Sequence, residues 1–307
     1  MVHRNCWLAV ALLSWVNAAA AAPDEWTRLD QQTAAQYQAR DYVAAAVSAQ
    51  QALVLAERDS DAGPGAVRLA TSLNALALIE QAQGRLGEAQ TLLERALTVA
   101  EKALPADHPN LIALRANLAS VRDAQHGQAL ADEARQAQDF NEQALAHHER
   151  GEYEQAASLY EQALPLVEKH FGTDSVEVAR VLASLAGTYA ARKQYPQAEA
   201  LYQRALELFD AYQGEVIAQA GVLNELATVE YLQRRYAKAE PLFRQALELL
   251  ESARGRDHVD LLPALDNLVA LYRTTRREAK AEEFRRRAAA IRKAHGLGAS
   301  DTYEPAP

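Results

Sequence analysis

The stretch GEYEQAASLYEQAL at residues 151–164 decides the fold, because close copies of it recur along the chain. The copies read GRLGEAQTLLERAL at 84–97, KQYPQAEALYQRAL at 193–206 and RRYAKAEPLFRQAL at 234–247. A weaker copy begins at Asp41, and a last one runs through Glu278 to Ala288. Self-similarity with a period of about 42 residues predicts a repeat architecture rather than a single closed core.

Each copy places alanine at two positions seven residues apart, and four of the copies have a bulky apolar residue between them. Offsets of three, four and seven residues lie on one face of an α-helix. The small alanines let a neighbouring helix approach closely, and the bulky residue fills the remaining gap. The bulky residues are Leu93, Tyr160, Tyr202 and Phe243, and the alanines are Ala45, Ala89, Ala156, Ala198, Ala239 and Ala281 followed by Ala52, Ala96, Ala163, Ala205, Ala246 and Ala288.

A second helical pattern precedes each of these helices. In the fifth repeat it consists of Leu182, Leu185, Ala186 and Tyr189, at offsets 0, 3, 4 and 7. Only 13 glycines and 10 prolines occur in 307 residues, while strong helix formers dominate. Two antiparallel helices with complementary stripes, repeated along the chain, predict an all-α solenoid whose units bury their faces by stacking.

The repeated pattern resembles the tetratricopeptide repeat, and its period resembles the kinesin-light-chain-type variety. That variety often has an Asp-His-Pro stretch between units, and residues 106–109 (ADHP) and 256–259 (RDHV) occupy this place. The resemblance covers roughly residues 26 to 294 and implies a superhelical solenoid of antiparallel helix pairs. We expect Asp107 and Asp257 to cap the helices that follow, leaving His108 and His258 as loop residues.

The repeat spacing breaks once, near the middle of the chain. Leu86 and Gln128 stand one full period apart, but Tyr153 follows Gln128 after only 25 residues, and neither proline nor glycine occurs from Gln128 to Arg150. We therefore expect a continuous bridging helix over residues 127–150. It would join an N-terminal repeat sub-array, residues 26–126, to a C-terminal one, residues 137–294. Residues 295–307 are expected to form a flexible tail.

The N-terminus is typical of a secretory signal peptide. A basic residue, Arg4, precedes an apolar run from Cys6 to Val16, and five alanines follow Asn17. Residues 1–21 are the predicted signal peptide, cut near Ala20 or Ala21, which predicts a periplasmic or secreted protein. An uncleaved membrane anchor is the alternative, although the run is shorter than a membrane span of about 20 residues. The excess of arginine over lysine and the many alanines suggest a bacterial, exported protein with no transmembrane span in the mature chain.

Composition and motifs argue against several classes of function. A net charge of −9 is unfavourable for binding nucleic acid. The chain has one cysteine and contains neither a glycine-rich phosphate loop nor a His-Glu-x-x-His motif, so we expect no enzyme, no cofactor and no catalytic residue. His147 and His148 are the densest candidate metal ligands, but adjacent residues diverge by about 100° on a helix, so no metal site is predicted.

Polar residues recur on the first helix of several units, on the wall that faces the groove of a curved solenoid. An amide side chain both donates and accepts hydrogen bonds, which suits the backbone of an extended peptide. In the resembled family, asparagines at such positions contact bound peptides. The alternative is that each asparagine bonds an adjacent helix and binds nothing. The candidate peptide-binding residues are Asn74, Asn117, Asn141, Ser184, Asn224 and Asn267, with Arg180 as a candidate for carboxylate recognition.

The C-terminal helix differs in charge from the rest of the chain. Residues 273–293 contain nine basic and three acidic side chains, and the run Arg285, Arg286 and Arg287 covers most sides of a helix. A terminal repeat needs a polar outer face for solubility, which is one explanation. The other is a docking surface for an acidic partner.

Two functions follow from these patterns. The first is a non-catalytic scaffold of the cell envelope that binds a protein or peptide partner and holds an extended segment in its concave groove. The alternative is a structural spacer or self-assembling component of an envelope complex, acting through its ends and outer faces. Whether the chain forms homo-oligomers is left open by the sequence.

Overall fold

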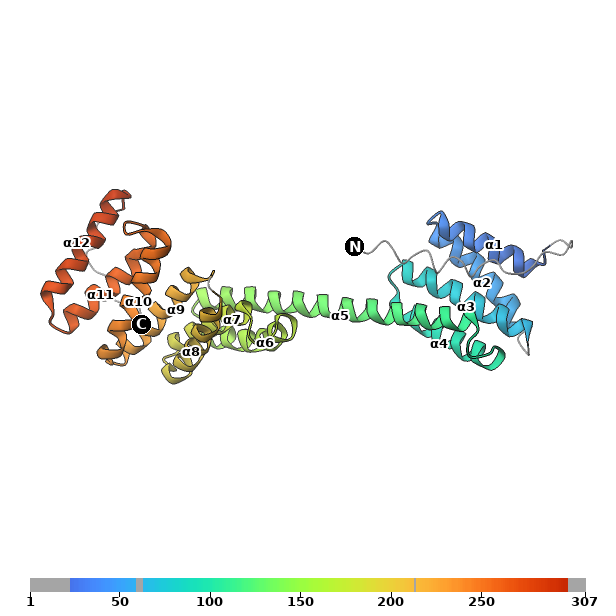
Figure 1. Cartoon of the computed structure of the whole chain (residues 1–307), viewed down its shortest axis with the longest axis horizontal. Coiled ribbons are helices and arrows are strands. Elements are labelled where there is room, and N and C mark those ends of the chain that lie inside the picture. Colours follow the sequence, from blue (N-terminus) through green and yellow to red (C-terminus); the bar gives the residue numbers. More distant parts are fainter. Residues whose placement is uncertain (1–22, 59–62, 213, 298–307) are drawn as a thin grey trace. The chain divides into compact units, whose positions relative to one another are not determined.

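The computed structural model describes residues 23–58, 63–212 and 214–297, and these residues form α-helices joined by short turns (Figure 1). The all-α prediction is therefore confirmed. The chain divides into two compact units, unit 1 (Met1–Ala129) and unit 2 (Leu130–Pro307). The predicted signal peptide, residues 1–21, and residues 298–307 of the predicted tail lie outside the described residues.

Unit 1 consists of two helix pairs followed by the beginning of a long helix. Its helices are α1 (Glu25–Gln38), α2 (Tyr42–Arg58), α3 (Pro64–Ala82), α4 (Leu86–Ala103) and the N-terminal part of α5 (Pro109–Glu149). Helices α1 and α2 pack as a pair, as do α3 and α4, and α2 also packs against α3. Trp26, Leu73, Leu93 and Leu114 belong to one continuous apolar core in this unit.

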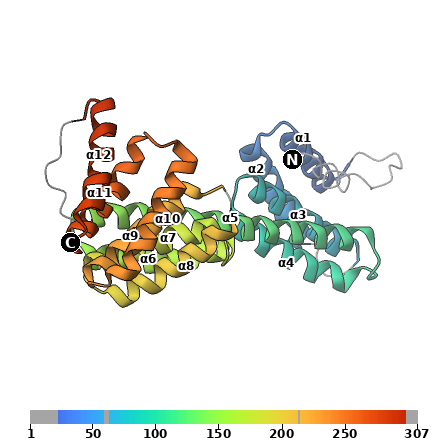
Figure 2. The same cartoon turned by 60° about the vertical axis from the view of Figure 1, so that its left-hand side comes forward.

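Unit 2 begins within α5 and continues the same arrangement (Figures 1 and 2). Its further helices are α6 (Tyr153–Phe171), α7 (Val176–Ala191), α8 (Tyr195–Ala211), α9 (Val216–Leu232), α10 (Tyr236–Arg254), the 3-10 turn η2 (Val259–Leu261), α11 (Leu262–Thr274) and α12 (Glu278–Ala294). The pairs are α7 with α8, α9 with α10, and α11 with α12. Each pair also packs against the next, because α8 contacts α9 and α10 contacts α11.

The repeated alanines and bulky residues form the contact surfaces of the second helices, as predicted. All twelve alanines are at most 2% exposed. The bulky residues Leu93, Tyr160, Tyr202 and Phe243 are also at most 2% exposed. Because a buried alanine leaves room for close helix approach, substitution by a larger side chain at any of these positions would force the helices apart.

The turn between the two helices of a pair contains one residue in the left-handed region of backbone conformation. Gly84 and Gly151 occupy this position in two repeats, with φ of 79° and 76°. Elsewhere the residue has a side chain and φ between 58° and 62°, at Arg40, Lys193, Arg234 and Arg276. Since glycine adopts this conformation at lower cost, the basic residues show that the fold imposes the turn. These turn residues give a common reference for comparing repeats.

The long helix α5 spans the place where the repeat spacing breaks. It runs from Pro109 to Glu149, so residues 127–149 belong to a helix that already begins 18 residues earlier. Most side chains from Arg122 to Gln136 are exposed. On the unit 1 side, Arg115 and Arg122 of α5 donate to Glu101 and Glu94 of α4, each at 2.9 Å.

One local expectation is wrong. Asp107 and Asp257 do not supply the capping hydrogen bonds of the helices that follow them. The imidazole Nδ1 atoms of His108 and His258 accept instead, each from a backbone N–H two residues later, at 3.2 Å. The histidines do so because they occupy the position immediately before the helical turn, where a side-chain acceptor can reach the first unpaired N–H groups.

Candidate functional site

Two asparagine pairs join neighbouring first helices, one in each unit. In unit 1, the Nδ2 of Asn117 on α5 donates to the Oδ1 of Asn74 on α3 at 2.9 Å. In unit 2, the Nδ2 of Asn267 on α11 donates to the Oδ1 of Asn224 on α9, also at 2.9 Å. Both pairs are separated by 43 residues. The same amide contact therefore recurs in two separate arrays.

Counting back from the left-handed turn residue shows why these pairs form. The residues ten positions before the turn are Asp30, Asn74, Asn141, Ala183, Asn224 and Asp266, and those nine positions before it are Gln31, Ala75, Glu142, Ser184, Glu225 and Asn267. In unit 2, the bonded pair joins the first position of one repeat, Asn224, to the second position of the next, Asn267. We call these two positions, together with Asn117, the first-helix row.

The amides of the row keep hydrogen-bonding capacity beyond their mutual contact. Asn117 and Asn224 are half-buried, whereas Asn74 is 8% and Asn267 is 2% exposed. A primary amide has two donor hydrogens and an acceptor oxygen, and each pair uses one donor and one acceptor. The Oδ1 of Asn267 is buried and has no hydrogen-bond partner among the described residues. An unpaired buried acceptor is unfavourable, and because this atom is enclosed by the protein, the half-buried Asn117 and Asn224 are the amides of the two pairs that a ligand could contact.

The remaining predicted peptide-binding residues, Asn141, Ser184 and Arg180, lie in unit 2. Asn141 on α5 and Ser184 on α7 are half-buried and stand 43 residues apart, like the two bonded pairs. The carbonyl oxygen of Ser184 accepts from the hydroxyl of Thr188 at 2.9 Å. Arg180, the candidate for carboxylate recognition, already contacts both carboxylate oxygens of Glu215, at 2.9 and 3.0 Å. It would have to exchange this partner to bind another carboxylate.

Asp30 is a site residue that the sequence reasoning missed. Its side chain is 6% exposed and has no hydrogen bond or ion pair to the described part of the chain. Burial raises the pKa of its carboxyl to about 6. The position in the next repeat that corresponds to Asn267 of the bonded pair Asn224–Asn267 is Ala75, which offers no side-chain hydrogen bond. Alignment of the repeats on the turn residue at Arg40 would have found it.

Glu225 lies beside Asn224 in the row and was also missed. It is solvent-accessible, but the protein around it desolvates its carboxyl and raises its pKa. Its facing position in the preceding repeat is Ala183, which offers no hydrogen bond. In both units the row therefore combines amides with a carboxylic acid whose pKa is raised by burial.

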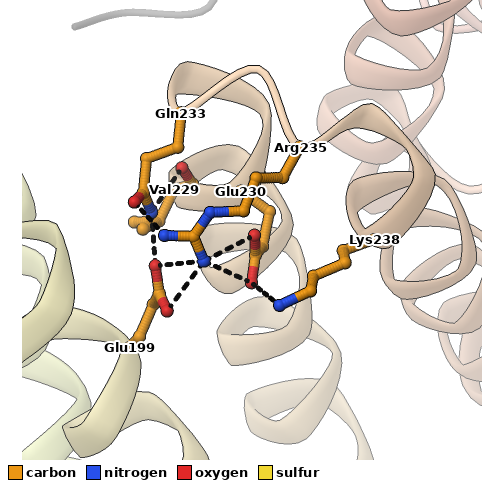
Figure 3. Close-up of polar contacts among 6 residues, drawn as sticks. All are labelled: Glu199, Val229, Glu230, Gln233, Arg235 and Lys238. Atoms are coloured by element: carbon orange, nitrogen blue, oxygen red, sulfur yellow. Dashed lines mark hydrogen bonds and ion pairs between the residues drawn. The ribbon is translucent and has the colours of Figure 1, made fainter.

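A polar cluster between α8, α9 and α10 has a structural role (Figure 3). Arg235 at the start of α10 lies between Glu199 on α8 and Glu230 on α9, with Nη1–oxygen distances of 3.0 and 3.2 Å. Gln233 also donates to Glu199, and Lys238 lies 4.0 Å from Glu230. Burial acts to raise the pKa of Glu199, but the hydrogen bonds from Gln233 and Arg235 outweigh it and lower the pKa. The cluster fastens one repeat's second helix to the next repeat's turn.

The same arrangement recurs one repeat later, which supports the structural interpretation. Arg277 donates to Glu240 at 2.7 Å, and the hydroxyl of Tyr272 donates to the other oxygen of Glu240 at 2.9 Å. These contacts therefore join successive repeats. The polar groups that take part in them are those of Arg235, Glu230, Arg277 and Tyr272, and they are hydrogen-bonded within the fold.

The arginine run of α12 is paired with carboxylates. Arg285 and Arg286 both contact Glu282, while Arg287 contacts Glu251 and donates to the carbonyl oxygen of Arg256. Arg286 remains 76% exposed. Within the residues that the structure describes, no group of three or more His, Cys, Asp or Glu side chains is arranged to hold a metal ion. None of the described helices has the length and hydrophobicity needed to cross a membrane.

Family models identify the repeats. Models described as tetratricopeptide repeat match residues 134–211 and 218–294, and a further one matches residues 69–110. The chain therefore belongs to the tetratricopeptide repeat family. Members of this family are scaffolds that generally bind other proteins, and the fold is typically non-catalytic. No curated protein matches the chain.

Solved structures with similar repeats come from several organisms. BtubC (BKLC) from P. vanneervenii is 25% identical, with coverage of 85% of this chain and 95% of that chain and a TM-score of 0.48. A putative kinesin light chain with TPR-like repeats from Podosopora anserina is 20% identical, with coverage of 76% and 99% and a TM-score of 0.43. Aspartyl phosphate phosphatase F from Bacillus subtilis is 16% identical, with coverage of 92% and 67% and a TM-score of 0.50. This last likeness shows the fold alone.

Proposed function

We propose that the protein is a non-catalytic scaffold whose first-helix row holds an extended peptide segment of a protein partner. The observation that carries the proposal is the repetition of the amide pair in both units, in which Asn117 and Asn224 remain half-buried and keep unused donor and acceptor groups. Amides at a regular spacing along stacked helices match the regular alternation of N–H and C=O groups in an extended backbone. Asn141 and Ser184 would extend the contact within unit 2.

We also propose that the repeats are of the kinesin-light-chain type and that the protein is located in the bacterial cell envelope. They rest on the repeat period and on the pattern of residues 1–21. Fractionation of the native host, with mass spectrometry of the mature N-terminus, tests the location. A periplasmic or secreted chain that begins directly after Ala20 or Ala21 supports it, and an intact N-terminus on a cytoplasmic chain contradicts it.

The groove proposal is tested by replacing both members of one amide pair. Asn224→Ala with Asn267→Ala removes donor and acceptor together, so no half-satisfied partner remains buried. Partner capture, measured by crosslinking and pulldown from intact cells, is expected to be lost while the circular dichroism spectrum is unchanged.

The matched control is the equivalent pair in the other unit, Asn74→Ala with Asn117→Ala. If the peptide binds to unit 2 alone, this control retains capture; if it binds to both units, capture weakens in each double variant. Full capture by both double variants would show that the amides of the row do not hold the partner.

The alternative function, a spacer or self-assembling component, would act through ends and outer faces. The exposed side chain of Arg286 and the positive charge of α12 favour an acidic partner at this end. Charge reversal at Arg285, Arg286 and Arg287 separates the two proposals, because it would disrupt assembly while leaving the first-helix row intact.

A further inference from the structure

We infer that the outer face of α2 is a self-association surface, on which α2 of a second copy of this chain packs antiparallel. The face consists of Val43, Val47, Gln50, Val54 and Glu57 and is called the α2 stripe. The three valines are 75%, 56% and 41% exposed. This surface lies on second helices rather than on the first-helix row, so the inference does not depend on the proposed peptide site.

The α2 stripe differs from the same surface in every other repeat. Helices α4, α6, α8, α10 and α12 can be aligned with α2 at their first residues. At the three valine positions, these five helices have only glycine, alanine, proline, serine, threonine or glutamate. The outer face of a terminal repeat is expected to be polar because it meets solvent. The valines on α2 therefore point to a partner.

The spacing of the stripe indicates that this partner is another helix. Successive members are four, three, four and three residues apart, which is the 3.5-residue average of helices that pack side by side. Residues 42–56 contain no charged side chain, so two copies of this face can approach without repulsion even though each chain has a net charge of −9. A helix that binds a membrane surface would instead have lysine and arginine along its polar edge.

The charges in register with the α2 stripe favour the antiparallel orientation. Arg40 stands three residues before Val43 and Glu57 three after Val54, whereas Asp41 and Arg58 are each one position off the stripe. In an antiparallel pair, one register places Val43 opposite Val54 of the second copy, Val47 opposite Gln50 and Arg40 beside Glu57. A parallel pair would place like charges together. Glu57 already bonds Arg95 on α4 at 2.7 Å, and the second copy's Arg40 would add to this contact.

A single helix pair buries less surface than the ~800 Å² per partner of a standard interface, so the dimer is expected to be concentration-dependent. Sedimentation velocity of the full chain at increasing concentration measures it. Val47→Glu places a charge in the stripe and is expected to raise the dissociation constant at least ~10-fold. The control is Ile112→Glu on α5, because Ile112 is 58% exposed, close to the value for Val47.

The control variant is expected to associate like the unchanged chain, and both variants are expected to keep its thermal unfolding midpoint. A monomer at all concentrations would overturn the inference, as would an equal loss of association in both variants. Loss of association caused by unfolding would appear as a lowered midpoint, and a second substitution, Val43→Gln, then decides the result without introducing charge.

Cysteine crosslinking tests the orientation. In a Cys6→Ser background, the chain has no other cysteine. Single variants Val43→Cys and Val54→Cys are mixed after one is lengthened by a tag, then oxidised. The antiparallel register predicts disulfide-linked heterodimers and little linkage within either variant alone. Linkage of each variant to itself, or no linkage at all, would contradict the proposed packing.

Discussion

Asp30 and Asp266 occupy the same position in the first and last repeats, yet their surroundings differ. Asp30 is 6% exposed and has no hydrogen bond or ion pair to the described residues, and burial raises its pKa to about 6. The side chain of Asp266 is 13% exposed and is paired with Arg292 of α12, whose side chain is 15% exposed. The same residue type at the same place is therefore satisfied in unit 2 and unsatisfied in unit 1.

This difference shows where the polar side chains of the first-helix row find hydrogen-bonding partners in repeats near an end of an array. Asn74 and Asn224 each bond an asparagine on the following first helix. No further repeat of the described chain follows α12, so Asp266 finds its partner on the second helix of its own pair. Asp30 faces alanine at the following first helix and lacks such a partner. Burial without a partner favours the neutral acid.

The largest effect on stability is expected from breaking the ion pair between Asp266 and Arg292. Arg292→Ala would leave Asp266 mostly buried without a cation. Because removal of one partner from a buried ion pair strands the other charge, the free energy of unfolding is expected to fall by about 3 kcal/mol at pH 7.5. Urea-induced unfolding monitored by circular dichroism measures the change. An unchanged midpoint would mean that water replaces Arg292 at no cost.

The second largest effect is expected at Asp30, which has no such partner, and here the substitution should stabilise the protein. Asp30→Asn introduces the residue found at this position in three other repeats and removes an ionisable group. At pH 7.5 the free energy of unfolding is expected to rise by up to about 3 kcal/mol, which corresponds to a pKa difference of about two units.

The pH dependence of this effect follows from the raised pKa. Below the unfolded pKa of about 3.9, Asp30 is protonated in both states and costs nothing. Between this value and the folded pKa of about 6, stability is lost as the pH rises, because the carboxyl ionises in the unfolded chain first; above the folded pKa the cost is constant. The gain from Asp30→Asn should therefore fall to about 0.5 kcal/mol at pH 4 and vanish at lower pH. Asp266→Asn is the matched control and should destabilise at pH 7.5; parallel pH profiles for Asp30→Asn and the unchanged chain would contradict the assignment.

The smallest effect is expected for an ion pair of the same kind that lies in solvent. Arg286 contacts Glu282 on α12 at 2.8 Å, but its side chain is 76% exposed. Water and salt screen such a pair, so Arg286→Ala should leave the unfolding midpoint unchanged. A loss comparable to that of Arg292→Ala would show that the contact, rather than its burial, determines the contribution.

Periodicity predicted the fold because each repeat makes the same local contacts. The alanines Ala156 and Ala163 and the ring of Tyr160 could be assigned to one buried helix face from spacing alone, and all three are buried. The helical-hairpin prediction needed only this regularity and the few glycines and prolines. The capping prediction at Asp107 failed because two adjacent residues both had side-chain acceptors, and only the backbone geometry chooses between them.

The candidate site was predicted in part. The asparagines were identified by their position relative to the apolar step of each first helix, and two pairs of them lie in contact. Asp30 and Glu225 were missed because an acidic residue on a helix is normally read as solvated. The partners of Arg180, Arg285 and Arg287 could not be predicted either, since long flexible side chains can reach several carboxylates on neighbouring helices.

The sequence by itself determined that the chain consists of paired helices and which repeated alanines and bulky residues are buried between them, because these follow from spacing within about 40 residues. The tertiary structure decided which polar groups are satisfied and which are stranded. Asp30 and Asp266 are equivalent in sequence position, and only the packing of neighbouring helices gives one a cation and leaves the other in a desolvated environment. Solvation and pairing depend on what surrounds a side chain in space, which periodicity does not record.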